Sequence, residues 1–322
     1  MVEVNYAPDE IYWSLDGVLY KNDSASNEIE ITCYPYAKAD SIAYIAYPVT
    51  LIPQYTFYGA KFTTVYLPAS VKRVGNGAFR SCTNLTTVIF NEAEEGQTAA
   101  NGLELASGTT SNAAFYSNSK LTYVNFPARL SKFDANVFAS CSAVSTLLVG
   151  NDKVNGNYYS YIASYDANGA IVGSIVTDRT RSTLIYVPRG YSGVTEEDGT
   201  TSYTIPSNIS VIGEWSFGGS SSTYACKFNK IVIPGTVSKI AESAFAYCQS
   251  MTQLIFEGKA EDVDLEICEF AFYYCSKITE VTLPANLKIL RQAAFAYTTQ
   301  LKTVNVTTDR AMVEYEAGAF AT

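Results

Sequence analysis

Residues 62–84, FTTVYLPASVKRVGNGAFRSCTN, are one copy of a unit of 23 residues. The same unit recurs at residues 121–143, 228–250 and 278–300, and looser copies occupy residues 85–120, 251–277 and 301–322. Five prolines are each followed eleven residues later by phenylalanine: Pro68/Phe79, Pro127/Phe138, Pro206/Phe217, Pro234/Phe245 and Pro284/Phe295. A short unit repeated at fixed spacing predicts a solenoid, in which stacked coils share one continuous core.

Each unit begins with a pattern that is typical of a short strand. Val65-Tyr66-Leu67 and Val281-Thr282-Leu283 alternate in the way that leaves one face buried, and the following proline ends the strand because it has no N–H to donate. The next apolar pair, such as Val71/Val74, predicts a second short strand or an irregular corner. The final A-F-x-x-C stretch predicts one turn of helix or 3₁₀ helix with its phenylalanine pointing inward.

The phenylalanines and the cysteines that follow them are predicted to form the core. We expect Phe79, Phe138, Phe245 and Phe295 to be buried and to have no part in binding. Four cysteines stand three residues after a phenylalanine: Cys82, Cys141, Cys248 and Cys275. Side chains at one position of adjacent coils point in parallel, which is a poor geometry for a disulfide, so we predict buried free thiols.

This repeat resembles that of the BspA-like leucine-rich repeat family of bacterial surface proteins. Length, proline, phenylalanine and cysteine positions agree over most of the chain, although Phe90-Asn91 and Phe256-Glu257 lack the proline and Thr298 replaces the cysteine. The resemblance implies a repeat solenoid of the leucine-rich-repeat type. We expect a right-handed coil of mainly short β-strands, with short helical or 3₁₀ turns and β-hairpin insertions.

A larger duplication divides the chain into two modules. Asp16-Gly17 and Asn168-Gly169 stand between apolar segments, so each predicts a hairpin turn. We therefore expect residues 1–149 and 150–322 each to contain a hairpin followed by repeats, with the first hairpin capping the stack. No linker rich in Gly, Ser or Pro separates them, so one continuous solenoid is predicted.

Composition excludes several classes of partner. The net charge of −9 repels nucleic acid and anionic membranes. The chain has no run of 18 apolar residues, so no transmembrane helix is predicted. The N-terminal residues Met-Val-Glu-Val-Asn-Tyr are not typical of a signal peptide. The resemblance, and not the residues, implies an extracellular or cell-surface location.

The residues offer no reaction chemistry. The chain has no histidine, which removes Ser-His-Asp and Cys-His catalysis and the commonest metal ligand. Nucleotide-binding motifs and close cysteine pairs for zinc are absent. Acidic clusters at residues 92–95, 196–198 and 261–266 are interpreted as solvated segments. Calcium binding by the last cluster and a glycosidase carboxylate pair are the alternatives. We predict a protein that is not an enzyme and that needs no cofactor.

The strand residues between the core positions are the candidate ligand surface, because alternate strand residues face opposite sides. The candidates are Thr64, Tyr66, Ile89, Tyr123, Asn125, Lys230, Gln253, Glu280, Thr303 and Asn305. The same alternation predicts that Thr87, Thr146, Leu148, Val232, Ile255 and Thr282 also face outward. An ordinary solvated sheet is the alternative.

Tyrosine is abundant, with 25 copies, and Tyr158, Tyr159, Tyr161 and Tyr165 cluster in mid-chain. They suit either recognition or packing of the hairpin. The resemblance implies a non-catalytic protein that adheres to host matrix proteins or to other bacterial surface proteins. Glycan binding and a structural spacer role in a longer surface protein are the alternatives.

Overall fold

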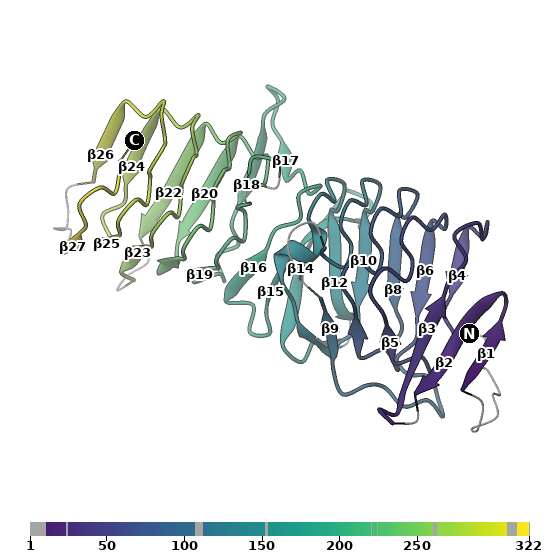
Figure 1. Ribbon diagram of the computed structural model, residues 1–322. Coiled ribbons are helices and arrows are strands. Elements are labelled where there is room, and N and C mark those ends of the chain that lie inside the picture. Colours follow the sequence, from purple (N-terminus) through teal and green to yellow (C-terminus); the bar gives the residue numbers. More distant parts are fainter. Residues whose placement is uncertain are drawn as a thin grey trace. The chain divides into compact units, whose positions relative to one another are not determined.

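The computed structural model describes residues 11–23, 25–106, 112–151, 154–219, 221–223, 225–259, 263–307 and 314–321. It divides into two compact units, Met1–Ser160 and Tyr161–Thr322, which are considered separately. Both consist of short strands that pair from coil to coil (Figure 1). No helix in the described part of the chain is long and apolar enough to span a membrane.

The first unit contains two sheets. One has seven strands in the order β1 (Tyr12–Leu15), β2 (Val18–Asp23), β3 (Glu28–Cys33), β5 (Leu51–Ile52), β7 (Arg73–Val74), β9 (Leu103–Leu105) and β11 (Leu130–Lys132). The other has six, in the order β13 (Val154–Asn155), β12 (Thr146–Asn151), β10 (Tyr123–Phe126), β8 (Thr87–Phe90), β6 (Thr64–Leu67) and β4 (Ile42–Tyr44). Each coil gives one strand to each sheet, which confirms the predicted second short strand.

The second unit repeats this plan. Its eight-stranded sheet has the order β14 (Tyr159–Tyr165, which starts before the boundary), β15 (Ile171–Asp178), β16 (Thr183–Tyr186), β19 (Val211–Ile212), β21 (Lys239–Ile240), β23 (Leu265–Ile267), β25 (Leu287–Leu290) and β27 (Glu314–Tyr315). A second sheet has four strands in the order β17 (Val194–Thr195), β18 (Thr201–Thr204), β20 (Lys230–Gly235) and β22 (Gln253–Lys259). A third sheet consists of two strands, β24 (Glu280–Leu283) and β26 (Thr303–Val306).

Both predicted hairpins are present. Leu15 and Val18 are paired across Asp16-Gly17, and both turn residues have positive φ. Such a turn favours glycine at its second position. The second turn, at Asn168-Gly169, joins the neighbouring strands β14 and β15. β3 then pairs in parallel with β5, so the first hairpin extends the sheet of the following coils.

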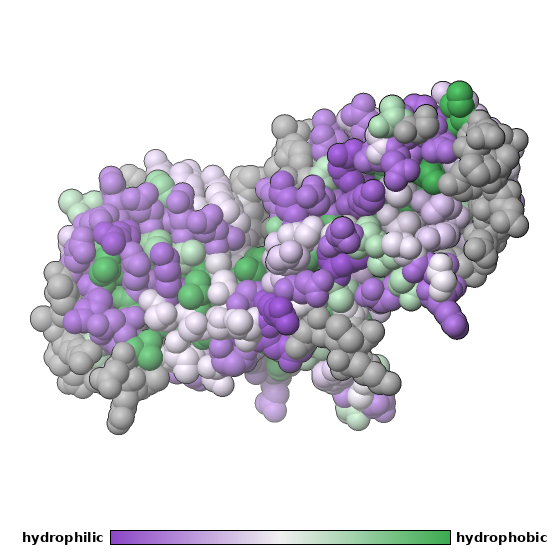
Figure 2. All heavy atoms as spheres, turned by 90° about the horizontal axis from the view of Figure 1, so that it is seen from below, coloured by the Kyte–Doolittle hydropathy of each residue, from purple (hydrophilic) through white to green (hydrophobic). Residues whose placement is uncertain are grey.

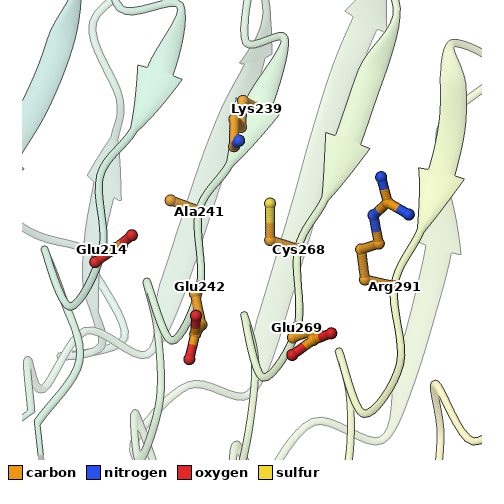
Figure 3. Close-up of a pocket in the computed structure, with 7 residues that line it drawn as sticks. All are labelled: Glu214, Lys239, Ala241, Glu242, Cys268, Glu269 and Arg291. Carbon is orange, nitrogen blue, oxygen red and sulfur yellow. The ribbon is translucent and has the colours of Figure 1, made fainter.

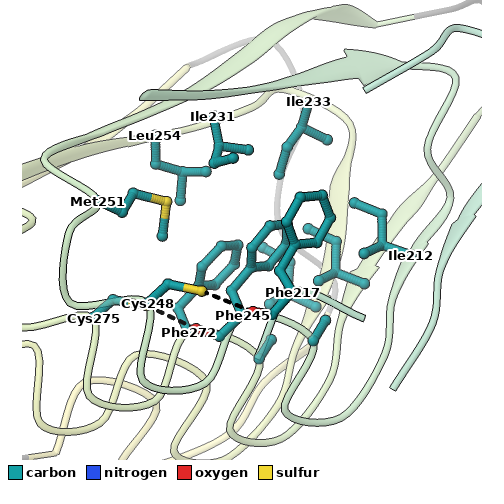
Figure 4. Close-up of a cluster of buried hydrophobic side chains, with 14 of the residues drawn as sticks. Ile212, Phe217, Ile231, Ile233, Phe245, Cys248, Met251, Leu254, Phe272 and Cys275 are labelled. Atoms are coloured by element: carbon teal, nitrogen blue, oxygen red, sulfur yellow. Dashed lines mark hydrogen bonds between the residues drawn. The ribbon is translucent and has the colours of Figure 1, made fainter. Parts of the chain in front are cut away.

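The core is a stack of phenylalanine rings, one from each coil. In the second unit Phe217, Phe245, Phe272, Phe295 and Phe320 stack at successive centroid distances of 4.5, 5.0, 4.7 and 5.1 Å. Figure 4 shows the first three of these rings. The first unit contains an equivalent stack of Phe57, Phe79, Phe115 and Phe138 at 4.7, 5.0 and 5.4 Å. These distances match the spacing of paired strands, so the strand ladders set the ring spacing. The four phenylalanines predicted to be buried are fully inaccessible.

The turn around the phenylalanine matches the predicted 3₁₀ helix in one coil and differs from it in the others. Only Ala135–Phe138 forms a 3₁₀ helix among the described residues, and the other copies are turns. The residues two before and two after the phenylalanine adopt left-handed backbone in many coils, as at Ser243 and Tyr247 around Phe245. A left-handed residue interrupts a right-handed helix, so the expected helical turn cannot form there.

The four repeat cysteines are buried free thiols. Each donates a hydrogen bond to the carbonyl of a phenylalanine in the preceding coil. The Sγ–O distances are 2.9 Å for Cys82 to Phe57, 2.8 Å for Cys141 to Phe115, 3.5 Å for Cys248 to Phe217 and 3.2 Å for Cys275 to Phe245. The cysteine position therefore links neighbouring coils as well as filling space.

Candidate functional site

The outer face of the six-stranded sheet carries two rows of side chains in register. Parallel pairing aligns Ile42, Thr64, Thr87, Tyr123 and Thr146 in one row. It aligns Tyr44, Tyr66, Ile89, Asn125 and Leu148 in the other. All five candidates of the first unit lie in these rows and are partly exposed, while the residues between them are buried. We call these two rows the sheet face.

Tyr44 is part of the sheet face that the sequence did not identify. It is 53 % exposed, and its ring stacks on Tyr66 with centroids 4.9 Å apart and an interplanar angle of 8°. The coil that carries it departs from the repeat consensus. The available signal was Pro48, four residues after Tyr44, because proline follows the strand in most copies. The two rings give this end of the sheet face an exposed aromatic surface.

The five candidates of the second unit lie in two other sheets. Lys230 and Gln253 are paired between β20 and β22. Glu280 and Thr303 are paired between β24 and β26, where Asn305 donates to Glu280 at 2.6 Å. All five are at least partly exposed. The structure therefore distributes the ten candidates over three sheets.

Two other positions expected to face outward are covered. Thr146 is 6 % and Val232 is 8 % exposed, so neither offers a contact surface. The face drawn in Figure 2 is mixed: hydrophilic residues predominate and hydrophobic ones are scattered among them, as on most protein surfaces.

A shallow groove of about 320 Å³ lies along the turns of the second unit. Figure 3 shows the side chains that line it: Glu214, Lys239, Ala241, Glu242, Cys268, Glu269 and Arg291. They come from successive coils, because each carboxylate stands two residues after a buried strand residue such as Ile212, Ile240 or Ile267. The groove is thus a product of the repeat.

Both cationic side chains of the groove form ion pairs with glutamates. Arg291 contacts Glu266 at 3.0 Å, Glu314 at 3.2 Å and Glu316 at 2.8 Å, and Lys239 lies 3.8 Å from Glu266. The hydrogen bond from Arg291 lowers the pKa of Glu316. These pairs link β21, β23, the residue after β25, and β27 with the residue that follows it, so they fasten neighbouring coils.

The groove also contains one thiol. Burial, and then the charge of Glu266, raise the pKa of Cys268, so the thiol stays protonated at neutral pH. Among the described residues no group of three His, Cys, Asp or Glu side chains is arranged to hold a metal ion. What the groove can offer a ligand is carboxylate charge.

Comparison with known proteins supports the repeat assignment. The model of the BspA type leucine rich repeat region matches six copies, over residues 50–155 and 219–322. The pneumococcal vaccine antigen PcpA has a similar fold, with a TM-score of 0.55 and 16 % identity over 94 % of this chain and 84 % of that one. A leucine-rich repeat protein from Eubacterium ventriosum gives a TM-score of 0.45 and 13 % identity over 94 % and 92 %. A comparison with curated proteins found no match. Because the family model covers more than half of its residues, the chain belongs to the BspA-type leucine-rich repeat family.

Proposed function

We propose that this chain is a non-catalytic interaction protein of the bacterial cell surface, which adheres to a protein ligand through the sheet face. Repeat proteins bind partners on extended regular surfaces of this kind. The family and the similarity to a pneumococcal antigen support a role in interaction. The observation that carries the choice of surface is the stacked, exposed pair Tyr44 and Tyr66.

The chemistry of the sheet face suits a protein ligand. Tyrosines supply rigid contact area at little conformational cost, and Thr64, Thr87 and Asn125 supply hydrogen-bonding groups beside them. Ile89 and Leu148 add apolar contact between the polar positions. This mixture resembles the composition of protein recognition surfaces.

The test uses purified chain against immobilised extracellular-matrix proteins and whole bacterial cells, with a glycan array in parallel. Tyr44→Ala with Tyr66→Ala should weaken binding about tenfold or more, because aromatic residues are enriched among those that dominate interface energy. Tyr58→Ala with Tyr165→Ala is the matched control, since both tyrosines are exposed outside the sheet face. Unchanged binding of the first pair would exclude this surface, and hits confined to the glycan array would favour the glycan alternative.

We also propose that residues 1–149 and 150–322 are two hairpin-led modules of one continuous solenoid. The support is the repetition of hairpin and coils in each unit. Small-angle scattering should give the dimensions of a single elongated rod. A profile that requires an ensemble of bent forms would contradict it.

A further inference from the structure

The turns of the second unit carry an aromatic patch that the repeat itself does not require. Tyr247, Tyr274 and Tyr297 each stand two residues after a core phenylalanine, and their rings stack at 5.2 and 4.6 Å with interplanar angles of 5° and 3°. Tyr273 meets these three rings edge-on at 5.5, 4.8 and 5.4 Å, and it contacts Phe270 at 5.4 Å. We call these five residues the tyrosine ladder.

The fold forms the same turn without tyrosine. At the position that follows the core phenylalanine by two, the first unit has Gly59, Ser81, Ser117 and Ser140, all with positive φ. The three stacked tyrosines also have positive φ, between 55° and 62°, a region that disfavours bulky residues. None of them is buried, and Tyr297 is 40 % exposed. Serine would therefore satisfy the backbone, and the tyrosines contribute a partly exposed aromatic surface instead.

Uncompensated carboxylates border this ladder. Glu214, Glu242 and Glu269 line the groove of Figure 3 on three successive coils. Within the part of the chain that the structure describes, none of the three side chains has an ion-pair or hydrogen-bond partner. Glu269 directly precedes Phe270 of the ladder, so the charged row and the aromatic patch meet in one turn.

The charge of the groove identifies the kind of occupant. Its two cations, Lys239 and Arg291, already contact Glu266, Glu314 and Glu316, so the groove and these partners contain six carboxylates and two cations. The surplus of negative charge attracts a cationic partner and repels a polyanion. Arginine and lysine are the side chains that carry a positive charge and can also pack on an aromatic surface. Their charged groups pair with carboxylates and pack on aromatic rings, while their aliphatic stems cover apolar surface.

We propose that the tyrosine ladder and the row Glu214, Glu242 and Glu269 form a docking surface for a basic polypeptide segment that presents arginine or lysine side chains. This surface lies in the second unit and is separate from the sheet face of the first. The carboxylates attract and orient the cations, and the tyrosines provide the contact area.

The experiment measures fluorescence anisotropy of labelled nona-arginine with the full chain at low and at moderate salt. The triple variant Glu214→Gln, Glu242→Gln, Glu269→Gln should weaken binding at least tenfold. The triple variant Tyr247→Ser, Tyr274→Ser, Tyr297→Ser should weaken it severalfold and leave thermal unfolding close to that of the wild type. Tyr297→Ser alone, at the end of the stack, should give a smaller loss in the same direction.

The matched control is Glu94→Gln, Glu95→Gln, Glu104→Gln, which removes the same charge from exposed positions of the first unit. It should change the affinity less than twofold. An equal loss in the two glutamine triples would show that only the net charge attracts the peptide and would overturn the proposal. No loss in the serine triple, or no binding by the wild type, would overturn it as well. Because the sheet face is unaltered, these outcomes are independent of binding to matrix proteins.

Discussion

The thiol of Cys275 donates a hydrogen bond to the carbonyl oxygen of Phe245 in the preceding coil, at an Sγ–O distance of 3.2 Å. The same carbonyl accepts from the backbone N–H of Cys248 at 3.1 Å. Cys275→Ala removes a buried sulfur atom and one inter-coil bond, so we expect a loss of about 1–2 kcal/mol in the free energy of unfolding in urea. Cys33→Ala, at an exposed site, should change it by less than about 0.5 kcal/mol. Equal effects would contradict the structural role of the repeat cysteine.

Thiol reactivity should divide the cysteines by burial. Desolvation raises the pKa of Cys82 to about 12, and Cys248 and Cys275 are shifted in the same direction. The reactive form is the thiolate, so these thiols should be nearly inert to Ellman's reagent at pH 8 while exposed Cys33 reacts readily. In denaturant without reductant all seven cysteines should react. A lower count would reveal a disulfide.

The phenylalanine stack should respond most strongly at its centre. Phe272 is fully buried between Phe245 and Phe295, so Phe272→Ala should cost about 3–5 kcal/mol. Phe272→Leu keeps most of the volume and should cost less. Chemical denaturation measures both, with Tyr165→Ala as the exposed control. A small effect of the alanine variant would mean that the coils do not depend on a shared core.

The pair between Arg291 and Glu316 should make stability depend on pH. The hydrogen bond from Arg291 lowers the pKa of Glu316, so the folded chain binds fewer protons there than the unfolded chain. The contribution is present above the unfolded pKa and is lost as the pH falls through the folded pKa. The difference in stability between the wild type and Glu316→Gln should be largest near neutral pH and should shrink as the pH falls below the ordinary pKa of glutamate. Glu95→Gln, at an exposed position of the first unit, is the control. If the difference in stability between the wild type and Glu316→Gln stayed the same at every pH, the ion pair with Arg291 could not be its cause.

The core could be predicted from sequence because each unit repeats it at fixed spacing. The prolines mark where strands such as β6, β10 and β24 end, and the phenylalanines eleven residues later are buried. Alternation within a strand also identified which residues of β6, β8 and β10 face outward. These features are local or periodic, so a single chain displays them directly.

What lies outside the repeat consensus needed the structure. Tyr44 joins the sheet face only because β4 pairs in register with β6, and Thr146 and Val232 are covered despite outward-facing positions. The turns around the phenylalanines contain left-handed residues that propensity does not reveal, and this backbone displays Tyr247, Tyr274 and Tyr297 as a stack.

The sequence by itself determined the solenoid, its family resemblance, its two hairpins and the identity of its core, since periodic apolar residues have no other way to be buried together. The tertiary structure alone decided which side chains from different coils become neighbours: Tyr44 with Tyr66, Cys275 with Phe245, and Arg291 with Glu316. The physical reason is register. Contacts between coils depend on how strands pair across about 20–40 residues of sequence, and the turns between them set that pairing.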